Sequence, residues 1–587
     1  NRMHFIENGT SGSQNIIISQ GTGANVTIPP GDTKAVYLDG AGSGAAVVDA
    51  FASLNVVDLK VEDDLTVTDD AAIGGDLAVT GAAVVDGTIN TLGITGPKTN
   101  FVGSMLISND AGTGTLDAAS NNTGFGNEVF DDLTSGDSNT GVGAQALAKL
   151  TTASENVAVG YAALTAATTG GNNIAIGKDA LIALTTGNTN IAIGTDALTT
   201  NVAGDRNVGV GEGALQTLNP SGNVDTLNVA VGYNAGLNVT TGVRNTLIGG
   251  LAGDALTNSV LNTAVGYQAL TAATTADLNT AIGANSLSTN ILSDRNTAVG
   301  TGSLATHNLA TNADGYNTAM GYNAGTAVTS GLANTLIGGL AGDSITTGDH
   351  NVGLGTSVLN TNTQGNKNVA IGSSALGDFN VGTDTDTFNT AVGHAAGTAL
   401  STGSFNTIVG GIAGDALTEG QENVAFGYSA LSTDTLGSHT TAIGKDALFS
   451  QNFTTATDSF NTAVGFSAGV AVTTGVSNTI IGGTAGDALT DADFNTAVGK
   501  DALSADTLGS KSTAIGTGTL GAQNFTTATD TFNTAVGYFA GIAVTTAEQS
   551  TFVGGLAGDA ITTGNVNVAL GYSALSTATI NAANVAL

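Results

Sequence analysis

The 587-residue sequence contains no cysteine, no tryptophan and only four prolines. Without cysteine, the chain can form neither a disulfide nor a thiolate metal site. Only 13 residues are lysine or arginine against 47 acidic ones, which gives a formal net charge of −34. Nucleic acids and anionic membranes both attract basic patches, so this charge disfavours both as partners. Because no apolar run reaches the length of a membrane-spanning helix, we expect no membrane insertion by this segment.

Charged and aromatic residues are also scarce, at 10% and 5% of the chain. An ordinary globular protein has about 25% charged residues. The hydrophobic fraction is nevertheless 41% and glycine supplies 85 residues, whereas disordered chains avoid apolar side chains. We therefore expect an ordered protein that is built by thin, regular packing of small residues.

A short motif, Asn-Thr/Val-Ala-Val/Ile-Gly, recurs through most of the chain, for example at residues 156–160 and 262–266. Its last residue, which we call the closing glycine, occurs 26 times from Gly126 to Gly571 at spacings of 17 or 21 residues. From Gly321 onward, three steps of 17 and one of 21 repeat every 72 residues. The sequence stops inside a motif at Leu587, so we expect it to be a piece of a longer protein.

Alternation within the motif predicts a short β-strand in each repeat. We expect its β-branched residues to point into the coil, since they suit a buried pleated surface, and the alanines to lie on the opposite face. A second apolar step, as at 269–270 and 430–431, predicts a second strand, so each 17-residue coil becomes one turn of a parallel β-roll or β-solenoid. Glycine tolerates a positive φ at the turn. Residues expected inside are Val159, Ile176, Ile193, Val265 and Ile282, those expected opposite are Ala158, Ala175, Ala192, Ala264 and Ala281, and the turn glycines include Gly160, Gly177, Gly194, Gly266 and Gly283.

Residues 172–177, Asn-Asn-Ile-Ala-Ile-Gly, are the closest copy of the Asn-Ser-Val-Ala-Ile-Gly signature of trimeric autotransporter adhesin heads. Residues 122–587 as a whole resemble this YadA-like left-handed parallel β-roll, although their coils are longer than the family's. The resemblance implies a homotrimer. A single-chain triangular β-helix is the structural alternative.

Upstream of the roll, apolar residues recur every six positions, and Asp64, Asp70 and Asp76 mark the turns. Residues 75–81, Gly-Asp-Leu-Ala-Val-Thr-Gly, resemble the shafts of phage tail fibres. We therefore expect a trimeric hexapeptide-repeat shaft at 51–100 and a transition at 101–121. Residues 1–50 are expected to form a small β module with strands near 15–19, 24–28 and 35–38 and a turn at 29–32. This segment resembles a module of marine phage fibre proteins.

Two catalytic motifs in the sequence are chance matches. Residues 465–469 fit the Gly-x-Ser-x-Gly nucleophile elbow, but the equivalent repeats have Asn, Ala or Phe in place of Ser467. Residues 516–521 fit a dinucleotide fingerprint without a helix pattern after them. The five histidines share no spacing that would build a ligand set. We expect no enzyme activity and no cofactor.

The segment Gly-Gly-x-Ala-Gly-Asp begins at Gly249 and returns at 338, 410, 482 and 554. It is similar to a calcium-binding nonapeptide element, but calcium rolls repeat that element in every coil, whereas here it recurs only every 72 or 89 residues. We expect wider turns without a metal, in which aspartates cap backbone amides. These aspartates are Asp254, Asp343, Asp415, Asp487 and Asp559.

The 21-residue coils carry extra loops in which aromatic residues gather, and the first of these coils contains Pro220. We expect four extra residues to protrude from each long coil. The rings are interpreted either as staples that pack the loop onto the roll or a neighbouring chain, or as an exposed platform for sugars or protein. The candidate residues are Phe388, Phe453, Phe460, Phe525 and Phe532.

The upstream resemblance implies a fibre of a phage tail, extracellular on the virion, that attaches to a host surface glycan or protein and docks to other tail proteins at its N-terminal end. The alternative is a trimeric autotransporter adhesin on a bacterial cell surface. An ice-binding solenoid is a distant third possibility. It requires a flat, regular Thr-x-Thr array, which Thr-Ala-Val with variable turns does not supply.

Overall fold

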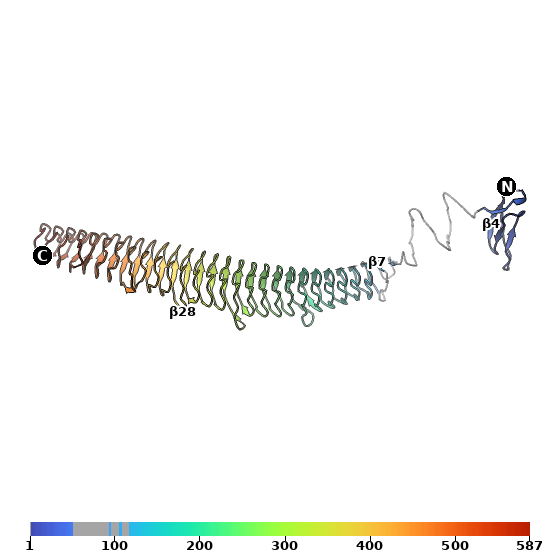
Figure 1. Cartoon of the computed structure of the whole chain (residues 1–587), viewed down its shortest axis with the longest axis horizontal. Helices are drawn as coiled ribbons and strands as arrows, with labels where there is room; N and C mark the ends of the chain where they lie inside the picture. The colour runs from blue at the N-terminus through green and yellow to red at the C-terminus, as the bar shows by residue number, and fades with distance from the viewer. Residues whose placement is uncertain (1, 41, 51–92, 96–104, 109–116) are drawn as a thin grey trace. The chain divides into compact units, whose positions relative to one another are not determined.

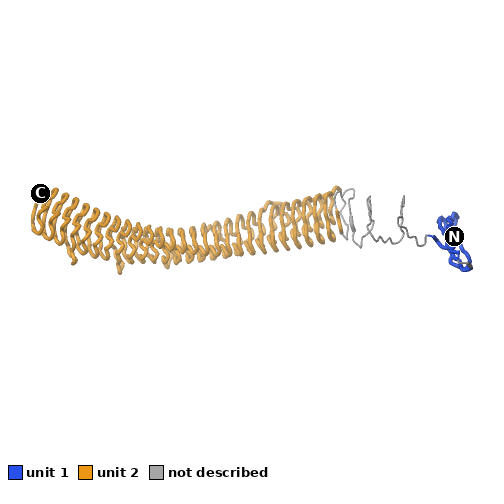
Figure 2. The backbone as a smooth tube through the Cα atoms, turned by 90° about the horizontal axis from the view of Figure 1, so that it is seen from above, with its two compact units in different colours: residues 1–84 blue, residues 85–587 orange. Residues whose placement is uncertain are grey.

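The computed structural model describes residues 2–40, 42–50, 93–95, 105–108 and 117–587. The chain divides into two units, residues 1–84 and 85–587 (Figure 2). All regular elements of the described residues are β-strands except one 3-10 turn, η1 (Gly42–Gly44), so the all-β prediction is confirmed. Apart from 93–95, the expected shaft at 51–100 lies outside the described residues.

The N-terminal unit is a small antiparallel β module, as predicted. β1 pairs with β4 and β4 with β5, while β2 pairs with β3. Val26, Ile28, Val36 and Val47 form its core. The strands are β1 (Met3–Glu7), β2 (Ile16–Ile18), β3 (Val26–Ile28), β4 (Thr33–Leu38) and β5 (Val47–Asp49).

The second unit is a parallel β-solenoid whose coils stack along one axis (Figure 1). Among the described residues, one ladder of 29 strands runs through it, and every pairing after that of β6 with β7 is parallel. The ladder consists of β6 (Gly93–Thr95), β7 (Met105–Ser108), β8 (Thr123–Phe125), β9 (Thr140–Val142), β10 (Val157–Val159), β11 (Ile174–Ile176), β12 (Ile191–Ile193), β14 (Val208–Val210), β16 (Val229–Val231), β17 (Thr246–Ile248), β18 (Thr263–Val265), β19 (Thr280–Ile282), β21 (Thr297–Val299), β23 (Thr318–Met320), β24 (Thr335–Ile337), β25 (Val352–Leu354), β27 (Val369–Ile371), β29 (Thr390–Val392), β30 (Thr407–Val409), β31 (Val424–Phe426), β33 (Thr441–Ile443), β35 (Thr462–Val464), β36 (Thr479–Ile481), β37 (Thr496–Val498), β39 (Thr513–Ile515), β41 (Thr534–Val536), β42 (Thr551–Val553), β43 (Val568–Leu570) and β44 (Val585–Ala586).

The register of the ladder follows the spacing of the motif. Val157 pairs with Ile174 across a 17-residue coil, and Val208 pairs with Val229 across a 21-residue coil. Each motif therefore stacks on the next one without slippage, and the predicted β-solenoid with coils of about 17 residues is confirmed.

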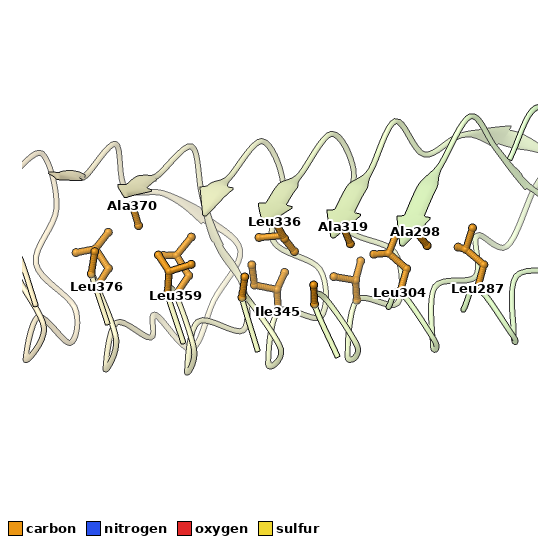
Figure 3. Packing of buried hydrophobic residues seen from close by; sticks show 14 of the residues in the cluster. Leu287, Ala298, Leu304, Ala319, Leu336, Ile345, Leu359, Ala370 and Leu376 are labelled. Carbon is orange, nitrogen blue, oxygen red and sulfur yellow. The ribbon is translucent and has the colours of Figure 1, made fainter. Parts of the chain in front are cut away.

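The prediction of which strand face is buried is wrong. Ala158, Ala175, Ala192, Ala264 and Ala281 are fully buried, whereas the β-branched residues expected inside are half-buried or exposed; these are Val159, Ile176, Ile193, Val265 and Ile282. The coil interior is thin, and leucines from the opposite wall fill it (Figure 3). Only alanine fits beneath the strand at most levels, so the larger residues face outward.

The expected second strand does not form either. At Ala269-Leu270 and Ala430-Leu431 the chain makes turns, and Leu270 and Leu431 have a φ of 56°. This left-handed backbone turns each leucine into the core beside the alanines of the strand. Each short coil thus has one strand and one irregular wall.

The closing glycines adopt positive φ, as predicted. Gly160 has a φ of 141°, and a Cβ at this position would lie 2.4 Å from the carbonyl oxygen of Gly177. Gly177, Gly194, Gly266 and Gly283 have φ values of 132° to 137° and the same close approach to the next coil. Any side chain in this column would push adjacent coils apart.

The asparagine that opens each motif stabilises the stack, a role that the repeat pattern alone does not indicate. Asn173 donates from its backbone and its Nδ2 to Oδ1 of Asn156, at 3.0 and 3.1 Å, and its Nδ2 also donates to the carbonyl of Gly187 at 2.9 Å. Both neighbouring coils are thereby tied to one buried amide. Such fully bonded buried groups avoid the cost of desolvation.

Each long coil adds a second, two-stranded parallel ladder and a loop. Small loops project from one edge of the solenoid (Figure 1). Pro220 lies outside the strands, as predicted for a residue that cannot donate to a ladder. The pairs are β13 (Gly204–Asp205) with β15 (Val224–Asp225), β20 (Ser293–Asp294) with β22 (Ala313–Asp314), β26 (Gly365–Asn366) with β28 (Thr385–Asp386), β32 (Gly437–Ser438) with β34 (Thr457–Asp458), and β38 (Gly509–Ser510) with β40 (Thr529–Asp530).

Candidate binding surface

One column of side chains borders the strands along the whole solenoid. It consists of the residues five positions before each closing glycine, and we call it the edge column. All 26 of these residues have positive φ, between 50° and 63°. They directly precede the buried asparagine or its hydroxyl-bearing replacement, so the backbone must turn here and their own side chains project outward.

The edge column concentrates rings and positive charge. Five of the nine lysines and arginines after residue 122 lie in it, namely Arg206, Arg244, Arg295, Lys367 and Lys511. Six aromatic side chains lie in it and are about half exposed, namely Tyr316, Phe388, Phe405, Phe460, Phe494 and Phe532.

At four long coils, a lysine, arginine or histidine from the preceding coil covers one face of an edge-column ring. Arg295 lies over Tyr316 at 5.9 Å, Lys367 over Phe388 at 5.1 Å and Lys511 over Phe532 at 5.2 Å. The imidazole of His439 stacks on Phe460 at 5.3 Å. A cation over an aromatic face is attracted by the ring quadrupole, which contributes about 0.5–1 kcal/mol at exposed sites.

The same cations also contact the aspartate two residues before the ring. Lys511 Nζ lies 2.5 Å from Asp530 Oδ2, and Lys367 pairs with Asp386 in the same way. Lys367 lowers the pKa of the Asp386 carboxyl below its ordinary value. Exposed pairs of this kind contribute little stability, so the arrangement mainly fixes the positions of the groups.

The five candidate aromatic residues fall into two sets. Phe453 and Phe525 are buried under the loops, at the position that Pro220, Leu309 and Val381 occupy in the other long coils. The staple interpretation fits these two rings. Phe388, Phe460 and Phe532 belong to the exposed edge column instead. The two sets also differ in sequence position. The buried rings lie 12 residues before the closing glycine and the exposed rings lie five residues before it, so this distance could have told them apart.

A buried polar network supports two of the loops. The Asp434 carboxylate accepts from Gln451 Nε2 at 2.7 Å and from the backbone N–H groups of Phe453 and Gly437 at 3.2 and 3.1 Å. Gln451 Oε1 in turn accepts from Asn461 Nδ2 at 2.9 Å. Burial raises the pKa of the Asp434 carboxyl. Asp506, Gln523 and Asn533 repeat this network one 72-residue group later.

The Gly-Gly-x-Ala-Gly-Asp segments allow a larger apolar residue to pack beneath the strand. In the coil of Gly249, Leu247 takes the place of the strand alanine, and a Cβ on Gly253 would lie 2.7 Å from both Leu247 and Leu256. The next coil has Ala264, Leu270 and Ala273 at these three positions. The glycine thus makes room for a larger strand residue. The other four copies combine Leu336, Ile408, Ile480 or Phe552 with a glycine in the same way.

Two of the turn aspartates bond hydroxyl groups of the next coil. Asp254 and Asp415 accept from the hydroxyl groups of Thr271 and Ser432, each at 2.5 Å. Oδ1 of Asp343, Asp487 and Asp559 is buried without a hydrogen-bond partner among the described residues. Burial raises the pKa of Asp343 and Asp487. Within the described ranges, no three His, Asp or Glu side chains gather as a metal site would require.

Within the 26 motif coils, all of which the structure describes, the outward face of the ladder carries no charged residue. In each of the 26 motif coils, the residue before the closing glycine is Val, Ile, Leu, Met or Phe, and the residue two positions earlier is Thr, Val or Ile. All of these side chains are half-buried or exposed. At about 4.8 Å per coil, this face is about 120 Å long.

Comparison with known proteins yields no match to a family model, to a curated protein or to a solved structure. Among the described residues, no helix is long and apolar enough to cross a membrane.

Proposed function

We propose that the chain is a fibre of a phage tail that attaches the virion to a host cell surface, and that it works as a parallel homotrimer without catalysing a reaction. The observation that carries this proposal is the outward face of the ladder. A long stack of coils presents it together with a regular column of exposed rings, so the molecule is organised for contact along its length.

The outward face supports a partner that covers it. Monomeric soluble proteins rarely expose contiguous apolar patches larger than a few hundred Å², and one column of this uncharged face is apolar in all 26 coils. The rest of the chain is strongly acidic, so a like-charged partner is repelled unless it too presents an uncharged face. A second and third copy of the chain present such a face at every level.

Three copies are favoured by the resemblances in the sequence. The roll resembles trimeric adhesin heads, and the six-residue repeat at 51–100 resembles trimeric fibre shafts. Three ladders that meet around one axis would bury their outward-facing Thr, Val and Ile side chains together and leave the irregular walls in solvent. This is the arrangement that we propose.

A phage fibre and a bacterial surface adhesin share this architecture. The segment at 75–81, which resembles fibre shafts, favours the phage. The full gene and its neighbours separate the two: a tail-docking segment and adjacent tail genes support the phage fibre, whereas a secretion signal and an outer-membrane anchor support the adhesin, which would lie on the cell surface.

Attachment is tested by labelling the purified chain with a fluorophore and measuring cell-bound fluorescence on a panel of Gram-negative bacteria by flow cytometry. We expect saturable binding to particular strains that excess unlabelled chain removes. Binding to no strain, or equal unsaturable binding to all of them, would contradict the attachment function.

The outward face does not favour ice binding. Threonine occurs in one of its two columns, and the other is entirely Val, Ile, Leu, Met or Phe. A Thr-x-Thr array is therefore lacking on this face too.

A further inference from the structure

The edge column contains a gap between two rings. Phe460, Ser477 and Phe494 occupy it on three successive coils, and both phenyl rings are more than half exposed. His439 covers the other side of Phe460. Two steps of about 4.8 Å separate the ring-bearing coils by about 10 Å. One further ring therefore fits between them at a normal stacking distance of about 5 Å from each.

The chain contains a filled version of this gap. Phe405 lies one coil after Phe388, as Ser477 lies one coil after Phe460, and its ring stacks on Phe388 with centroids 5.7 Å and planes 19° apart. Phe388 is the less exposed of the two preceding rings, at 47% against 58% for Phe460. Edge-column rings on adjacent coils thus stack face to face, and a ring-shaped ligand at Ser477 would take the place that Phe405 takes there.

Polar groups beside the gap indicate which kind of ring would enter. Asp458 is on the side of Phe460 that faces away from the gap, with its Oδ1 3.0 Å from His439 Nδ1. Asp493 precedes Phe494, and its Oδ1 accepts from the backbone N–H of Val476 at 2.7 Å. Carboxylates accept hydrogen bonds from hydroxyl groups, and aromatic faces pack against the C–H face of a sugar. The net charge of −34 repels phosphate and carboxylate ligands.

We propose that Phe460, Ser477 and Phe494 form a slot for one uncharged pyranose ring of a surface glycan. Phe460 and Phe494 stack on its two faces, and Asp493 accepts from its hydroxyl groups. The proposal rests on the attachment function above and names the class of receptor. The Phe388–Phe405 stack is the closed counterpart of the same geometry.

The slot is tested with the full chain and methyl glycosides of glucose, galactose, mannose and N-acetylglucosamine, by saturation-transfer NMR. We expect transfer to the ring C–H protons of at least one glycoside with the wild type, and its loss with Ser477→Phe. The backbone admits phenylalanine there, since Phe405 has a φ of 61° and Ser477 one of 58°. Phe494→Ala should weaken binding about tenfold through the loss of one stacking face.

Unchanged transfer in Ser477→Phe, or no transfer with any of the four glycosides, would overturn the slot. Transfer to N-acetyl-phenylalanine amide but to no glycoside would overturn it as well, in favour of a protein receptor. None of these measurements needs cells. Cell binding that persists in Ser477→Phe would therefore overturn the slot as the receptor site but leave the attachment function standing.

Discussion

The imidazole Nε2 of His307, in a long coil, lies 2.9 Å from the hydroxyl of Ser293 in the preceding coil, and both side chains are buried. Burial lowers the pKa of His307 from 6.5 to about 4, with a backbone hydrogen bond to Thr329 opposing part of the effect. The histidine is therefore neutral in the folded chain at neutral pH.

Acid should destabilise the coils around His307. Between pH 6.5 and about 4, the unfolded chain binds a proton that the folded chain does not, so stability falls as the pH drops through this range and levels off below it. The loss amounts to about 3 kcal/mol. Hydrogen exchange should show that the amides near residue 307 are less protected at pH 5 than at pH 7.

His307→Gln is the matched control, because Gln451 and Gln523 occupy the same position in later long coils. This variant should keep its protection at pH 5. Equal acid sensitivity of the variant and the wild type would show that another group is responsible.

A substitution of Gly253 should be tolerated only when the side chains that it contacts are changed as well. Gly253→Leu alone is expected to destabilise the coil by several kcal/mol, because a Cβ already meets two leucines at 2.7 Å. The triple variant Leu247→Ala, Gly253→Leu, Leu256→Ala copies Ala264, Leu270 and Ala273 of the next coil. It should recover most of the stability in thermal melting, and a triple variant no more stable than Gly253→Leu would refute the packing account.

The buried Asp434 should depend on its glutamine. Gln451→Leu removes one hydrogen-bond partner of a buried carboxylate, and we expect a loss of about 3 kcal/mol in the free energy of unfolding. At the first long coil and the coil before it, the residues that correspond to Asp434, Thr440 and Gln451 are Asn201, Asn207 and Leu218. The variant Asp434→Asn, Thr440→Asn, Gln451→Leu should therefore be more stable than Gln451→Leu in denaturant titrations. The opposite order would show that the charge itself is needed.

The two kinds of loop phenylalanine should respond differently to truncation. Phe453→Val removes part of a buried ring but copies Val381, so we expect a loss of about 1–2 kcal/mol, whereas Phe453→Ala should cost about 3 kcal/mol. Phe460→Ala, at the exposed edge column, should change stability by less than about 1 kcal/mol. Thermal melts of the three variants test this order, and an equal loss in Phe453→Ala and Phe460→Ala would contradict it.

Much of the solenoid could be predicted because glycine spacing measures the coil directly. Gly160 must approach Gly177 closely, so the 17- and 21-residue steps are visible without a structure. The inward face could not be found in this way. Period-two alternation places Ala158 and Val159 on opposite faces but does not say which face is buried. Larger apolar residues are usually expected inside, but this core has room for only a small side chain beneath the strand. The irregular wall was missed for a related reason, since a leucine in left-handed conformation such as Leu270 has no sequence signature of its own.

The candidate site could be located only in part. The long coils and their rings follow from the 72-residue repeat, but contacts between successive coils decide their roles. Phe460 and Phe405 look alike in sequence, and only the stack of Phe405 on Phe388 distinguishes a filled gap from an open one.

The native mass of the chain tests the central claim of a trimer that is closed through the outward face. Light scattering coupled to size exclusion should give three times the 57.2 kDa of one chain. Ile176→Glu, Ile282→Glu, Ile481→Glu places charges on the face and should yield one chain, while Thr169→Glu, Thr241→Glu, Thr402→Glu adds the same charge at exposed turns and should leave the trimer intact. A wild-type mass of 57.2 kDa, or a trimer that persists with three glutamates on the face, would contradict the account.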